Sequence, residues 1–110
     1  MNIVFASSKL EKIFNTEKSL QREYGQQARK IMRRMMVLRT ASTLASVPIL
    51  PPDRCHQLSG DYKGCFAVDL IHPFRLVFEP ADKPVPKKSD GGINLEQIFS
   101  IRILSVEDYH

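Results

Sequence analysis

The sequence predicts an α+β domain, in which two N-terminal helices cover one face of a small, mainly antiparallel sheet. Three observations predict this architecture. A short apolar segment opens the chain, a helical pattern then runs up to three prolines within residues 48–52, and strand-like segments fill the second half. With 110 residues, no repeats and no break in composition, residues 1–110 are expected to form a single domain in the order β-α-α-β-β-β.

The first half predicts a strand followed by helices. The apolar residues 2–5 suit a short strand, and Ser7 or Ser8 is a typical N-cap for the helix that follows. Thr16 interrupts that helix and can cap a second segment over residues 17–24. Beyond it, apolar residues recur at helical spacing, with cations largely on the opposite face. The apolar stripe, which we expect to lie in the core, consists of Ala28, Ile31, Met32, Met35 and Leu38.

The prolines end the helical half because they lack a backbone donor and fix φ. After them, residues 65–71 and 74–79 have the β-branched and aromatic composition of two antiparallel strands joined by a turn. Residues 80–92 contain prolines, glycines and mixed charge, which predicts an exposed loop. Residues 98–106 predict the last strand.

The composition favours a water-soluble, cytoplasmic protein. Hydrophobic residues make up 43% and charged residues 25% of the chain, the usual balance of a globular domain. The N-terminal apolar run is too short for a signal peptide or a membrane span, so no membrane association is expected. We expect Cys55 and Cys65 to act as small buried apolar side chains in a reducing compartment, and neither to form a disulfide nor to bind a metal.

The positive charge is concentrated in one helix. The formal net charge is +4, and residues 26–40 contain five cations and no acid. Such a run attracts phosphate and predicts an RNA- or ribosome-binding surface; it is equally typical of a solvated helix face or of a docking stripe for an acidic partner protein. The five cations are Arg29, Lys30, Arg33, Arg34 and Arg39.

Several motifs of known chemistry are missing from the sequence. It has no glycine-rich phosphate loop, no Cys-x-x-Cys or His-Glu-x-x-His metal pattern and no Gly-x-Ser-x-Gly nucleophile motif. We therefore expect neither a cofactor nor a metal. The remaining candidates are polar groups at strand ends and turns of the second half, namely His56, Asp61, Lys63, Arg75, Asp108, Tyr109 and His110.

Each of these groups has two interpretations. Arg75 lies in an otherwise apolar strand, so it needs either an ion pair with Asp69 or Glu79 or an external anion such as a phosphate. Lys63, in a turn, is a solvated side chain or a second cation. The C-terminal residues 108–110 form either an inert frayed end or, delivered by a long strand, a set of anchored proton-transfer groups.

Three motifs together resemble the HigB branch of the RelE/ParE toxin superfamily. They are the string His-Gln-Leu-Ser-Gly-Asp-Tyr-Lys-Gly at 56–64, the strand pair around Phe-Ala-Val at 66–68 and Phe-Arg-Leu-Val-Phe at 74–78, and the final Asp-Tyr-His. The resemblance implies a RelE-like fold with two helices on one side of a small sheet. It also implies a type II toxin, that is, a ribosome-dependent mRNA endonuclease inhibited by a cognate antitoxin.

The resemblance carries site residues over one by one. His56 matches the histidine before the family's Leu-x-Gly turn, Lys63 its basic turn residue and Arg75 the arginine of its aromatic-Arg-hydrophobic strand. The implied reaction is attack of a ribose 2′-OH on the neighbouring phosphate. The implied roles are His56 or Asp108 as base, Lys63 and Arg75 as charge stabilisers, His110 as acid, and Tyr109 as a stacking or positioning group.

The sequence departs from the family in two places. Phe66 and Phe74 stand where the family often has tryptophan, and the insertion at 80–92 replaces a tight turn. Two alternatives remain: a gyrase poison of the ParE type that acts by binding, and a non-catalytic RNA-binding or regulatory protein. The imidazoles and the C-terminal trio favour RNA cleavage over the gyrase poison.

Overall fold

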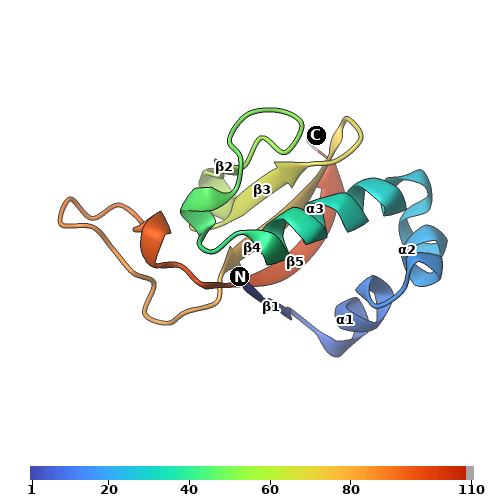
Figure 1. Cartoon of the computed structure of the whole chain (residues 1–110), viewed down its shortest axis with the longest axis horizontal. Coiled ribbons are helices and arrows are strands. Elements are labelled where there is room, and N and C mark those ends of the chain that lie inside the picture. Colours follow the sequence, from blue (N-terminus) through green and yellow to red (C-terminus); the bar gives the residue numbers. More distant parts are fainter. Residues whose placement is uncertain (109–110) are drawn as a thin grey trace.

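Five strands form one mixed sheet in the computed structural model, which describes residues 1–108 (Figure 1). In their order across the sheet they are β1 (Asn2–Phe5), β5 (Ser100–Asp108), β4 (Phe74–Pro80), β3 (Phe66–Asp69) and β2 (His56–Gln57). β1 runs parallel to β5, and all other neighbouring pairs are antiparallel. The α+β class and the mainly antiparallel sheet predicted from the sequence are confirmed.

Short helices precede the sheet's central strands along the chain. They are α1 (Ser8–Phe14), α2 (Glu17–Tyr24) and α3 (Ala28–Thr40). The Ser7 side chain accepts a hydrogen bond from the Leu10 amide and caps α1, and Thr16 caps α2 through the Ser19 amide. The predicted break at Thr16 therefore divides the first helical region into two short helices, and α3 is the second region.

α3 crosses one face of the sheet and forms the core with it (Figure 1). Ile31 and Leu38 of α3 are fully buried, as are Leu76 and Phe78 of β4. Because side chains alternate along a strand, Arg75 and Val77 of β4 point to the other face. Directly before α3, the buried side-chain amide of Gln27 ties the chain to the segment beyond β3: it donates to the Ile71 carbonyl and accepts from the Ile71 amide.

The methionine-rich side of α3 is only partly core. Met35 is buried, whereas 40% of Met32 and 69% of Met36 is exposed. The expectation that Met32 lies in the core is wrong, because α1 and α2 leave this side of α3 uncovered. Two large apolar side chains therefore face solvent on one helix.

The segment between β4 and β5 extends away from the sheet (orange in Figure 1). It contains an isolated bridge between Lys87 and Ile93 and a short 3-10 helix, Leu95–Gln97. Most of the predicted loop at 80–92 is confirmed as irregular, although Pro80 belongs to β4 and is buried. This segment lies at the opposite end of the molecule from α1 and α2 (Figure 1).

Candidate functional site

Arg75 lies near the start of the central strand β4, on the sheet face that α3 does not cover. Its cross-strand neighbours are Asp69 on β3 and Glu107 on β5, so these three side chains share that face. The guanidinium carbon lies 5.4 Å from the ring centroid of Tyr62, a cation–π distance. Tyr62 comes from the turn between β2 and β3, and this turn must therefore fold over the sheet to reach Arg75.

Glu107 joins the turn to β5. The hydroxyl groups of Tyr62 and Ser105 each donate a hydrogen bond to a different oxygen of the Glu107 carboxylate. The hydrogen bond to Glu107 raises the pKa of Tyr62, burial and the charge of Glu107 raise it further, and the charge of Arg75 opposes the rise. A cation, a carboxylate and two hydroxyls are thus held together on one face.

The two acids that the sequence offered as partners of Arg75 are each bound to another arginine. The Arg54 guanidinium donates two hydrogen bonds, of 2.6 and 2.9 Å, to the Asp69 carboxylate. The backbone of Arg54 has a left-handed φ of 45°. Glu79 pairs with Arg102 at 3.1 Å. Each of the two carboxylates therefore has an arginine partner other than Arg75.

His56 lies on the same face as Arg75. It pairs with Ala67, which pairs with Val77, and residues directly opposite each other in a sheet point to the same side. Its Nδ1 atom is 2.7 Å from the Arg54 carbonyl oxygen, which can only accept a hydrogen bond. Nδ1 therefore carries a proton, and Nε2 is the nitrogen able to accept one.

Of the other predicted site residues, Lys63 lies next to the Tyr62 turn, whereas Asp108 points to the opposite sheet face. Lys63 is exposed and directly follows Tyr62 at the end of the 3-10 turn Gly60–Tyr62. Asp108 pairs with Phe74, whereas the neighbouring Glu107 pairs with Arg75. Because side chains alternate along a strand, the Asp108 side chain points to the sheet face opposite to that of Glu107. Tyr109 and His110 lie outside the described residues.

Two residues of this cluster, Tyr62 and Glu107, were missed by sequence reasoning. Ser105 and Glu107 are spaced two apart along β5 with the apolar Val106 between them, which predicts a shared face. That spacing was the available signal for Glu107. No sequence pattern predicted a role for Tyr62, because its contacts depend on how the turn between β2 and β3 folds back over the sheet.

The cationic run of α3 divides into buried and exposed members. Arg34 is only 5% exposed; its guanidinium donates to the carbonyls of Asp69 at 2.6 Å and Pro52 at 3.2 Å and lies 3.6 Å from the Asp53 carboxylate. Its assignment to an exposed RNA-binding surface is wrong, because its donors anchor α3 to the neighbouring loop. Lys30 is half-buried. The exposed members are Arg29, Arg33 and Arg39.

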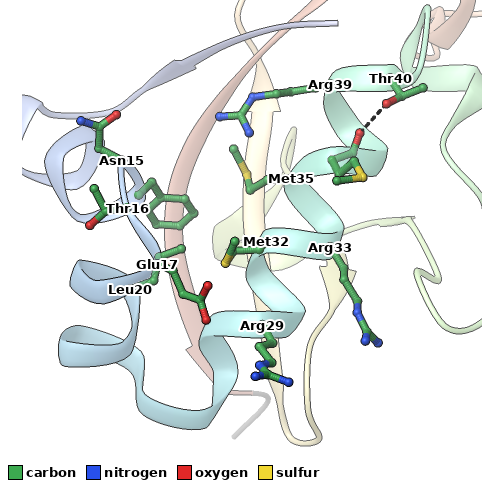
Figure 2. A pocket seen from close by; sticks show the side chains of 12 residues that line it. Asn15, Thr16, Glu17, Leu20, Arg29, Met32, Arg33, Met35, Arg39 and Thr40 are labelled. Carbon is green, nitrogen blue, oxygen red and sulfur yellow. Dashed lines mark hydrogen bonds between the residues drawn. The ribbon is translucent and has the colours of Figure 1, made fainter.

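These exposed arginines line a groove of about 770 Å³ between α3 and the α1–α2 segment (Figure 2). Figure 2 shows Met32, Met35 and Arg39 pointing from α3 toward that segment, where Glu17 faces them. The groove lies on the helical side of the molecule, whereas Arg75 lies on the other side of the sheet.

The fold resembles that of a known toxin. The chain aligns over its full length with the full length of a YoeB/ParE toxin from Agrobacterium tumefaciens, with a TM-score of 0.55 and 15% sequence identity. No protein-family model and no curated protein sequence matches the chain. The likeness at this identity shows the fold, and the chemistry must be argued from the residues themselves.

The described residues add three further observations. Among residues 1–108, no group of three or more His, Cys, Asp or Glu side chains is arranged to hold a metal ion. Cys55 and Cys65 are free thiols, the first of them buried. No helix within the described part of the chain is long and apolar enough to cross a membrane.

Proposed function

We propose that this chain is the toxin of a type II toxin–antitoxin system, and that it cleaves mRNA on the ribosome until a cognate antitoxin inhibits it. One observation supports the proposal most strongly: His56 and Arg75, both implied by the resemblance to HigB toxins, lie on the same face of the sheet. The likeness of the fold to a YoeB/ParE toxin is consistent with it.

The proposed reaction needs a base, a charge stabiliser and an acid. Nε2 of His56 takes the proton from the ribose 2′-OH, whose oxygen then attacks the adjacent phosphorus and displaces the 5′-oxygen of the next nucleotide. Arg75 and Lys63 stabilise the additional negative charge on the phosphate oxygens. Proton transfer and charge stabilisation each lower such barriers by about 3–5 kcal/mol.

The register of β5 favours His56 over Asp108 as the base. Glu107 faces Arg75, and the side chain of Asp108 leaves the strand on the other side. His110 as the acid that protonates the leaving 5′-oxygen, and Tyr109 as the group that stacks on a base, remain part of the proposal. Glu107 has a positioning role in it, because it holds the Tyr62 turn and therefore the adjacent Lys63.

A matched pair of arginine variants tests the proposal. Arg75→Met removes the charge and keeps the aliphatic stem, whereas Arg102→Met removes a cation from the same sheet that is bound to Glu79. We expect R75M to cut mRNA on translating ribosomes at least about 100-fold more slowly, the loss typical of a removed transition-state donor, with R102M within a few fold of the parent. Removing His110 should abolish growth arrest while circular dichroism shows an intact fold.

The position of the cut ends distinguishes the alternatives. Cuts on translated messages, in phase with codons, support the nuclease. Breaks in DNA trapped by gyrase would show a poison of the ParE type, and neither kind of break would show a non-catalytic binding protein. Equal activity of R75M and the parent chain would reject Arg75 as a charge stabiliser.

A further inference from the structure

Arg54, two residues before the proposed base His56, has an unusual backbone conformation. Its φ is 45°, and no other non-glycine residue among residues 1–108 has a positive φ. In this region the Cβ atom of an L-residue crowds the carbonyl oxygen that follows it, so other interactions must hold the residue there. Residues held in this way are concentrated at functional sites. The contacts of Arg54 therefore indicate what the conformation serves.

The peptide group between Arg54 and Cys55 is held at both of its polar ends. The Cys55 amide donates to the Pro48 carbonyl at 2.9 Å, and the Arg54 carbonyl oxygen lies 2.7 Å from Nδ1 of His56. A trans peptide directs its N–H and its C=O to opposite sides, so a rotation that breaks one of these contacts also breaks the other. The tautomer of His56 therefore depends on the backbone conformation of Arg54.

The side chain of Arg54 attaches this backbone to the sheet. Its two hydrogen bonds to the Asp69 carboxylate form a planar fork, which fixes direction as well as distance. The backbone of Asp69 is itself held, because its amide donates to the Asp53 carbonyl and its carbonyl accepts from the buried Arg34. The pair thus ties Arg54 to the end of β3, the strand that pairs with His56.

Stability alone does not explain the pair of Arg54 and Asp69. The exposed fractions of the two side chains are 42% and 26%, and ion pairs with such access to water contribute little to folding. Arg102 and Glu79 form a second pair on the same face with similar exposure, 32% and 28%, and neither has a positive φ. The Arg54 pair differs in that its own carbonyl contacts an imidazole.

We propose that Arg54 and Asp69 are positioning residues that keep the proton of neutral His56 on Nδ1. With the Arg54 carbonyl in place, Nδ1 donates and Nε2 keeps its lone pair. Once the peptide turns, the proton can occupy Nε2 instead, and that atom then cannot take a proton from a ribose hydroxyl. The effect on RNA cleavage rests on the proposed function, whereas the effect on the tautomer does not.

NMR of the imidazole nitrogens measures the tautomer without RNA. The full chain is labelled with ¹⁵N at its three histidines, and spectra are recorded at about pH 9, where an ordinary imidazole is neutral. His56→Gln identifies the signals of residue 56. We expect the parent to show the proton on Nδ1 and Arg54→Ala to show a mixture of both tautomers, because alanine lacks the pair and disfavours a positive φ. Arg54→Gly also lacks the pair but adopts a positive φ readily, so it should resemble the parent more closely than R54A does.

Two further variants distinguish the pair from a general loss of charge. Asp69→Asn keeps the shape of the side chain and removes its charge, so it should produce a smaller change of the same kind as R54A. Arg102→Ala deletes the other exposed pair and should give the parent spectrum. Circular dichroism verifies the fold of each chain. A parent spectrum in R54A or, if that chain does not fold, in D69N overturns the proposal, and so does a mixture of tautomers in R102A.

Cleavage of mRNA on translating ribosomes is the second readout. We expect R54A to lower kcat about tenfold and to change KM by less than about twofold, because the base is impaired and RNA binding is not. R54G should lose less. An unchanged kcat in an R54A chain with mixed tautomers would overturn the catalytic role of the pair. A parent chain that cleaves no RNA would reject the proposed function, and the spectra would still decide whether the pair fixes the tautomer.

Discussion

The two sides of the sheet differ in how they use their arginines. On the uncovered sheet face, Arg54 and Arg102 are bound to carboxylates, and Arg75 stacks on Tyr62 beside Glu107. In the helix groove, the exposed arginines have no such partners among the described residues. The difference indicates that the charges of the uncovered sheet face are held in place by the fold, whereas the groove arginines are left exposed by the described residues.

The sharpest test of this comparison uses two adjacent residues of α3. Arg33 is exposed, whereas Arg34 is buried against two carbonyls and Asp53. Arg34→Met leaves a buried carboxylate without its cation, so we expect it to lower the free energy of unfolding by about 3–5 kcal/mol. Arg33→Met should change it by less than about 0.5 kcal/mol, as surface substitutions do. Urea unfolding of both variants measures the difference, and equal stabilities would contradict the assignment of Arg34 as an anchor.

A smaller effect on stability tests whether the loop that contacts Arg34 excludes water. Burial, followed by the charge of Asp53, raises the pKa of the Cys55 thiol from 9.0 to about 11. Between these values the unfolded chain ionises its thiol and the folded chain does not, so this contribution to stability is complete below pH 9 and is lost as the pH rises to about 11. The loss amounts to about 2–3 kcal/mol.

The variant Cys55→Ala isolates that contribution. It should show a flatter decline of unfolding free energy from pH 8.5 to 11 than the parent chain, whatever its stability at neutral pH. The other ionising groups are common to both proteins and cancel in the comparison. Parallel curves would mean that the thiol ionises equally readily in the folded and unfolded chains.

The smallest expected effect concerns the turn that carries Lys63. The hydrogen bond to Glu107 raises the pKa of Tyr62, so this tyrosine should ionise at a higher pH than an unperturbed one. Glu107→Gln removes the negative charge and should lower the pKa of Tyr62 toward its ordinary value, as followed by NMR of the tyrosine rings. In the same variant we expect slower RNA cleavage. An unchanged Tyr62 titration would show that Glu107 does not hold the turn.

Local patterns in the sequence were sufficient for most of the elements. The caps at Ser7 and Thr16 are set by side chains bonding to amides three residues away, and the strands β3 and β4 by alternation over consecutive residues. Each of these patterns involves only a few consecutive residues, so it can be recognised without the tertiary structure. β2 was missed because two residues are too few to show alternation, and its pairing with β3 depends on the turn between them.

The sequence by itself determined the class of fold, the amphipathic α3 and the presence of Arg75 in a strand of the second half, and it singled out His56 without placing it in a strand. Only the tertiary structure decided which arginine each acid binds, and that Glu107 rather than Asp108 faces Arg75. It also decided that Arg34 is buried while Arg33 is free. The physical reason is that neighbouring residues on a helix point about 100° apart, and neighbours on a strand point to opposite faces. Which of these side chains is buried depends on the segments that pack against the helix or strand, and those segments are distant in the sequence.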